Sequence, residues 1–285
     1  MLSAEILSPL RCFLSDERDL PMVWEIEKDG RCSHLVGAAH FFPYRFRGSL
    51  RRYVRSARSV LVEGPLDEDA GRKVVAAGSA RRGASLCDAL HASTVHKINR
   101  TLRLSTSPLS ANRLYWEAFQ GDPKDWLAAQ TRGLAPWMAF MQLWNRYRAP
   151  QGWTYSTDLD MVGVAADLGK DVHPLESIEE QIEALNGIPL ERIVAFLADI
   201  DWDEYVSTYV RRYLAGDLEG LIATARAFPT FCESIIDRRD PILYARMSPF
   251  LEEGDAVACV GIVHCPGIIR LLRAGRYRVV PAGRR

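Results

Sequence analysis

Short apolar runs near both ends of the chain predict the strands of a β-sheet. Residues 23–27 and 32–37 flank Lys28-Asp29-Gly30-Arg31, and Asp-Gly between two such runs indicates a β-hairpin. Residues 255–261 form a continuous apolar run, which is typical of a strand buried on both faces. Further short strands are predicted at residues 59–62, 171–175 and 276–281.

The segments between these strands follow the 3.6-residue period of amphipathic helices. Residues 48–58 place Leu50, Tyr53 and Val54 on one face. Ser177, followed three residues later by Glu180, predicts a capped helix start. We therefore expect one α/β (α+β) domain over residues 1–285. Its sheet is expected from residues 22–65, 170–176 and 255–281, and its mostly helical parts from residues 66–168 and 177–251.

The charge balance and the apolar runs of the chain indicate which kinds of partner to expect. Lys and Arg together number 36, and so do Asp and Glu. A neutral chain gives no electrostatic reason to expect nucleic acid or an anionic membrane as the main partner. Residues 1–20 contain no apolar run long enough for a signal peptide, and no window has the ~20 apolar residues of a membrane span. These features favour a soluble, cytoplasmic protein.

Polar residues fall at the carboxyl ends of the predicted strands. His40, Glu63, Glu176 and His264 each follow a strand closely in the sequence. Ligands of open α/β sheets bind outside the carboxyl ends of the strands, so we expect these four side chains to meet. Imidazoles and carboxylates hold divalent ions such as Mn, Co or Zn, and a bound ion activates water near neutral pH.

Each histidine of this set ends a Gly-x-x-His element, at Gly37–His40 and Gly261–His264. Glycine at these positions would let backbone or substrate approach closely. The same residues also have structural interpretations. A strand-end histidine often serves as a hydrogen-bonded structural residue, Glu63 precedes Gly64-Pro65 in a polar turn, and Glu176 suits the first turn of a helix.

Several blocks of the sequence, in order, resemble the TraB/GumN family, which is related to the Tiki proteins. Residues 24–40 resemble its opening hairpin and first Gly-x-x-His, and Val62-Glu63 resembles its strand-end glutamate. Residues 158–177, with Gln181 after them, resemble its block from an aspartate through Gly-Lys to Leu-Glu-Thr. Arg238-Arg239-Asp240 resembles its Arg-Asn pair, and residues 261–278 resemble its closing Gly-x-x-His block. Asp240 and Ser177 depart from the Asn and Thr that are usual there.

The resemblance implies a mixed sheet that contains both Gly-x-x-His elements, and a cleft formed by the helical insertion. It also implies a metal-dependent, peptidase-like hydrolase that acts on a peptide or small molecule. His40, Glu63 and His264 would form the core of the site, with Glu176 as a fourth metal ligand. Whether Glu63 is a ligand or the general base stays open.

Two more residues enter the site through the same resemblance. Arg239 would stabilise an oxyanion or bind a substrate carboxylate, or else form a structural ion pair. Asp158 would support the site.

Two other functions are compatible with the same residues. The first is a metal-free esterase, as in the related erythromycin esterases, in which His and Glu activate water directly. The second is a regulatory protein that binds a peptide or haem without turnover. The sequence leaves the substrate, the identity of the metal and the oligomeric state undetermined.

Overall fold

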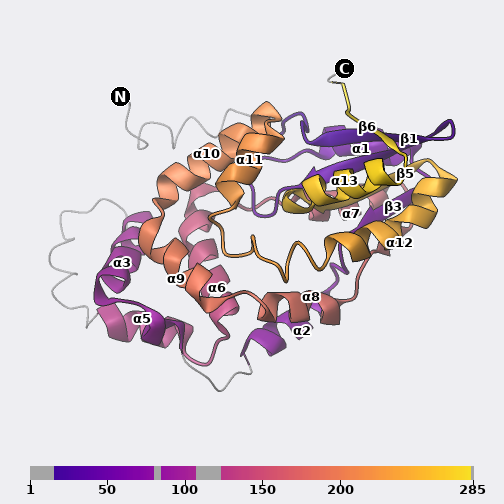
Figure 1. Ribbon diagram of the computed structural model, residues 1–285. Helices are drawn as coiled ribbons and strands as arrows, with labels where there is room; N and C mark the ends of the chain where they lie inside the picture. Colours follow the sequence, from indigo (N-terminus) through magenta and orange to yellow (C-terminus); the bar gives the residue numbers. More distant parts are fainter. Residues whose placement is uncertain (1–15, 80–84, 107–122, 284–285) are drawn as a thin grey trace, which may run out of the picture.

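The computed structural model describes residues 16–79, 85–106 and 123–283. In these ranges six strands form one mixed sheet, in the order β4-β3-β5-β2-β1-β6 (Figure 1). Its hairpin joins β1 (Val23–Lys28) to β2 (Arg31–Ala38). Asp29 and Gly30 both have positive φ, 53° and 74°, as the two central residues of a type I′ turn require. The α/β class, the hairpin and the mixed sheet are therefore confirmed.

Four neighbouring strands of the sheet are parallel. β5 (Ala256–Gly261) lies between β2 and β3 (Ser59–Val62), and β4 (Val172–Pro174) follows β3 at the edge. Every residue of β5 is buried, as its continuous apolar run predicts. β6 (Arg278–Pro281) pairs antiparallel with β1 on the other side. The carboxyl ends of the four parallel strands therefore point to the same edge.

The pairing register brings the two Gly-x-x-His elements together. Gly37 pairs with Val260, and Ala38 pairs with Gly261. The chain leaves β2 and β5 at the same level of the sheet, although more than 200 residues separate the two strands. The segments that carry His40 and His264 therefore begin side by side.

Helices pack on both faces of the sheet. α1 (Arg47–Ser56) contacts α7 (Thr157–Asp167), and α12 (Asp240–Glu253) contacts α13 (Cys265–Ala274). In Figure 1, α12 and α13 lie in front of the strands, and α1 and α7 lie behind them. The buried face of α1 contains Leu50, Tyr53 and Val54, as its sequence period predicts.

The remaining helices form a second mass beside the sheet (Figure 1). As expected, most of the described part of residues 66–168 and 177–251 is helical, although residues 80–84 and 107–122 lie outside the described ranges. The helices are α2 (Glu68–Ser79), α3 (Ala92–Thr106), α5 (Pro123–Thr131), α6 (Pro136–Arg148), α8 (Ile178–Asn186), α9 (Leu190–Asp199), α10 (Trp202–Ala215) and α11 (Leu218–Ala225). No described helix is long and apolar enough to cross a membrane.

Two boundaries differ from those predicted. Within residues 177–251, which were expected to be mostly helical, α12 begins only at Asp240, because residues 236–239 form turns and Pro241 lies at the start of the helix. β4 covers three residues instead of five, and its last residue, Pro174, has no amide hydrogen to donate. The predicted capping box is present: the Ser177 hydroxyl accepts from the Glu180 amide, and the Glu180 carboxylate accepts from the Ser177 amide.

Candidate functional site

The four strand-end residues do lie near one edge of the sheet. His40 follows β2, Glu63 follows β3 directly, and Glu176 follows β4. His264 ends a single 3₁₀ turn, η5 (Ile262–His264), that begins where β5 stops. The Glu176 amide donates to the Glu63 carbonyl over 3.0 Å. The backbone pairing of β3 with β4 thus continues beyond the strands and fixes the two glutamates beside each other.

Arg239 connects these two glutamates. Its Nη2 donates to Oε1 of Glu63 and to Oε1 of Glu176, and its Nε donates to Oε2 of Glu176 over 3.1 Å. The side chains of Glu176 and Arg239 are only 1% and 9% exposed. Burial alone would lower the pKa of Arg239, but the two carboxylates raise it above its ordinary value. Arg239 thus forms the buried ion pair that the sequence left as one of its two interpretations.

Each histidine is oriented by an aspartate. Nδ1 of His264 lies 2.7 Å from Oδ1 of Asp240, and Nδ1 of His40 lies 3.2 Å from Oδ2 of Asp158. A carboxylate on Nδ1 fixes the ring and leaves Nε2 as the atom that is available for chemistry. Nε2 of His264 lies 3.7 Å from Oε1 of Glu63.

Gly261 lies where the side chains of His40, Glu63 and His264 come together. Its amide donates to Oε2 of Glu63 over 2.8 Å. A Cβ added to Gly261 would lie 3.2 Å from Oε2 of Glu63, 3.4 Å from Nε2 of His40 and 3.4 Å from Cδ2 of His264. All three side chains therefore surround one small space that the missing Cβ leaves free.

Gly37 serves packing rather than the site. A Cβ at this position would lie 2.3 Å from Cδ1 of Ile262, and the Gly37 carbonyl accepts from the Tyr213 hydroxyl over 2.7 Å. Glycine here allows the turn after β5 to pack against β2. The close approach expected at Gly37 is therefore made by the protein's own core.

The charges of the site are unbalanced. Glu63, Glu176, Asp158 and Asp240 bring four carboxylates, against the one guanidinium of Arg239. Burial favours a higher pKa for Glu63, but His264, Arg239 and His40 outweigh it and lower that pKa to about 2. The site therefore retains negative charge and favours further positive charge on or between the histidines.

The negative charge of the site raises the pKa of His40. Partial removal from water tends to lower its pKa, but the Asp158 carboxylate, with help from Glu63, raises it to about 9. Burial acts to raise the pKa of Asp158, and His40 and Ser156 lower it below its usual range. His40 and Asp158 therefore form an ion pair at neutral pH when no other cation is present.

The site opens to solvent at His40. The His40 side chain is 44% exposed, whereas that of His264 is 2% exposed. The next residue, Phe41, is also exposed and has a φ of 53°, a left-handed conformation that is strained for an aromatic residue. The Arg148 guanidinium stabilises it, since Nη1 donates to the Phe41 carbonyl over 3.2 Å. A substrate would approach from the His40 side.

Three residues of this arrangement received no role from the sequence. Asp240 orients His264, and Gln181 donates to Oε1 of Glu176 over 3.3 Å. Gly267, in the first turn of α13, lets Asp240 approach, because a Cβ there would lie 1.7 Å from Oδ2 of Asp240. Asp240 and Gln181 lie in the blocks that resemble the family, so the sequence could mark them as candidates for the site. It could not give their roles, because those depend on contacts that form only in the fold.

The donor set fits a divalent ion in type and orientation. Two imidazoles offer Nε2 while carboxylates hold Nδ1, and carboxylates commonly hold metal-bound histidines in this way. Among the described residues, however, the ligand atoms of His40, Glu63 and His264 do not all lie within 4.8 Å of one another. One ion bound by all three would draw them closer, and the exposed ring of His40 has room to move.

Comparison with known proteins agrees with this layout. A sequence profile of the TraB/PrgY/gumN family matches residues 22–281, which include every residue of the site. No curated protein matches the chain.

Proposed function

The chain belongs to the TraB/PrgY/gumN family, and we propose that its carboxyl-edge site belongs to a metal-dependent hydrolase of amide bonds. One observation carries the proposal: two carboxylate-oriented histidines present Nε2 beside Glu63 in a site where four carboxylates face one guanidinium. Such a site favours a cation, and its nitrogen and oxygen donors suit a divalent transition metal.

Each residue has a distinct part in this proposal. His40, His264 and Glu63 would hold the ion, and Asp158 and Asp240 keep the rings in the orientation that exposes Nε2. A bound divalent ion lowers the pKa of its water to about 7. Glu176 has both oxygens on Arg239, so we assign it to positioning that guanidinium rather than to the ion.

Arg239 acts through Glu63 in this arrangement. Its donors are directed to Glu63, Glu176 and the Ile235 carbonyl, and Nη1 also faces His264. The guanidinium keeps Glu63 ionised and in place while the Gly261 amide holds the other oxygen. Arg239 is therefore a positioning residue rather than a group that receives the substrate.

A metal-free hydrolase is the second candidate, since the ring of His40 and the carboxylate of Glu63 line the same small space. His40 has its pKa raised to about 9, whereas Glu63 has its pKa lowered to about 2. Two neighbouring groups with pKa values pushed apart are a recurrent sign of an acid and a base. The His40 imidazolium would protonate the leaving group, and the Glu63 carboxylate would accept a proton from water.

Metal content together with hydrolysis separates these candidates. The protein, without a polyhistidine tag, is analysed by elemental mass spectrometry beside His40→Ala and His264→Ala, with circular dichroism to confirm folding. Peptide and ester libraries are then assayed with Mn²⁺, Co²⁺ or Zn²⁺ and with a chelator.

Metal that both variants lose, and hydrolysis that the metal restores after chelation, would support the metallohydrolase. Hydrolysis that resists chelation and is lost in Glu63→Gln would favour the metal-free enzyme. Stoichiometric peptide binding that survives Glu63→Gln without any product would overturn both and indicate a sequestering protein.

A further inference from the structure

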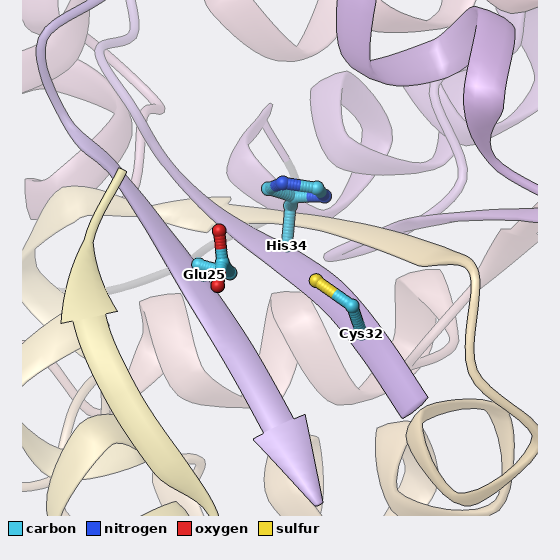
Figure 2. A group of neighbouring side chains, drawn as sticks. All are labelled: Glu25, Cys32 and His34. Carbon is cyan, nitrogen blue, oxygen red and sulfur yellow. The ribbon is translucent and has the colours of Figure 1, made fainter. Parts of the chain in front are cut away.

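A second cluster of donor side chains lies on the β1–β2 hairpin, away from the carboxyl edge. Glu25 on β1 pairs directly with His34 on β2, and Cys32 precedes His34 by two residues on the same face. One carboxylate oxygen, the thiol sulfur and one ring nitrogen all lie within 4.8 Å of one another. Figure 2 shows the three side chains converging over the two strands.

The backbone and a neighbouring ring hold this cluster together. The antiparallel ladder fixes the cross-strand pair of Glu25 and His34. The His34 ring lies against Tyr53 of α1, with 4.9 Å between ring centroids. All three donors therefore lie at regular strand positions, so the cluster needs no loop to rearrange.

The charges around the cluster favour a cation. Glu27 pairs with Cys32 across the hairpin, and the Asp255 amide donates to the Cys32 carbonyl, which places a third acid nearby. Arg278 and Arg52 are opposing charges. Nη2 of Arg278 lies 3.3 Å from Oε1 of Glu25, its Nε donates to Glu27 over 2.9 Å, and Arg52 lies close enough to His34 to disfavour positive charge there. Glu27 can keep Arg278 paired when Glu25 turns to another partner.

We propose that Glu25, Cys32 and His34 form a binding site for a divalent cation of the zinc type. Thiolate, imidazole and carboxylate are the ligands that zinc takes in proteins, and three of them leave a fourth tetrahedral position for water. Binding replaces the S–H bond of Cys32 by a metal–sulfur bond and releases the thiol proton to solvent. The ion would link β1 to β2.

This site is separate from the carboxyl-edge site. His34 precedes the end of β2 at Ala38 by four residues, which is about 13 Å along a strand. The proposal does not depend on the hydrolase, but it affects the elemental analysis above, because the protein would carry metal here after the loss of His40 or His264. Of these two sites, both formed by described residues, the hairpin site is the one that offers a partly exposed thiol to the metal.

Cobalt spectroscopy tests the proposal. The full-length protein is titrated with Co²⁺, and the ultraviolet thiolate-to-cobalt charge-transfer band is recorded, followed by displacement with Zn²⁺. We expect saturating Co²⁺ to give the band in the parent and in His40→Ala and His264→Ala, and we expect its loss in Cys32→Ser and His34→Ala. Cys232→Ser, which changes another partly exposed cysteine, is the matched control and keeps the band.

A band that persists in Cys32→Ser, or no band in the parent, would overturn the site. A second measurement needs no variant: alkylation of Cys32 by iodoacetamide, mapped by mass spectrometry, should slow at least tenfold with Zn²⁺ while that of Cys232 does not change. Equal protection of both cysteines, or of neither, would contradict the proposal. Neither result depends on whether the protein hydrolyses anything.

Discussion

Asp240 Oδ1 lies 2.7 Å from Nδ1 of His264, inside a region where both side chains are almost fully buried. A buried carboxylate at this distance holds the imidazole in one orientation and keeps the proton on Nδ1. Nε2 therefore faces Glu63 and Arg239. The same relationship recurs between Asp158 and His40 at the exposed side of the site.

The first prediction concerns Asp240. Asp240→Ala should free the His264 ring, and the affinity for a bound metal should fall about 10–100-fold, as is usual when the carboxylate that holds a metal-bound histidine is lost. Asp240→Asn should lose less, because the amide oxygen can still accept the Nδ1 hydrogen bond. ¹⁵N NMR of the histidine rings reports the Nδ1–H tautomer without any assay. An unchanged His264 tautomer in Asp240→Ala would contradict this role.

A second prediction concerns stability. Arg239→Ala leaves Glu176, which is 1% exposed, without its buried partner. Removing one member of a buried pair costs about 3–5 kcal/mol, so the free energy of unfolding should fall by that amount in denaturant titrations. Arg238→Ala is the matched control, since its pair with Glu233 is well exposed and should be worth about 0.2–1 kcal/mol. Equal losses in the two variants would refute a buried, stabilising role for Arg239.

The third prediction is a pH dependence of the metal-free protein. The pKa of His40 in the folded state, about 9, lies above the ordinary histidine value of 6.5. The pair with Asp158 therefore stabilises the fold fully below pH 6.5, and its contribution is lost as the pH rises through 9. The His40 ring should titrate near pH 9 by NMR, and Asp158→Asn should move that pKa down. A His40 ring that titrates near pH 6.5 in the parent would refute the ion pair.

The sequence predicted the site as a set of positions but not as a set of contacts. Strand-end placement and the family-like blocks were enough to group His40, Glu63, Glu176 and His264, because parallel strands deliver their carboxyl ends to one edge. The contacts depend on register and on distant chain segments. Arg239 reaches Glu176 across 63 residues, and Asp240 reaches His264 across 24. No local pattern encodes those distances.

The helix boundaries show the same limit. Ser177 and Glu180 cap α8 through contacts three residues apart, so the sequence located that helix start. The start of α12 depends instead on the turns at residues 236–239, which place Arg239 and Asp240 inside the site. From the sequence, residues 177–251 were expected to be mostly helical and these turns were not located, because their hydrogen bonds depend on the surrounding fold.

The last prediction uses Gly267 to test how closely α13 and α12 must approach. A Cβ added at Gly267 would lie 1.7 Å from Oδ2 of Asp240, so Gly267→Ala must displace that carboxylate or the helix. Overpacking of this kind costs about 1–3 kcal/mol, and the His264 tautomer should change as in Asp240→Ala. Gly71→Ala in α2 is the control, since no atom lies within 4 Å of its added Cβ. The Gly71→Ala change should stabilise the protein by up to about 1 kcal/mol, because alanine favours a helix more than glycine does. Chemical denaturation of both variants measures the difference. A Gly267→Ala protein as stable as Gly71→Ala would contradict the close contact between Gly267 and Asp240.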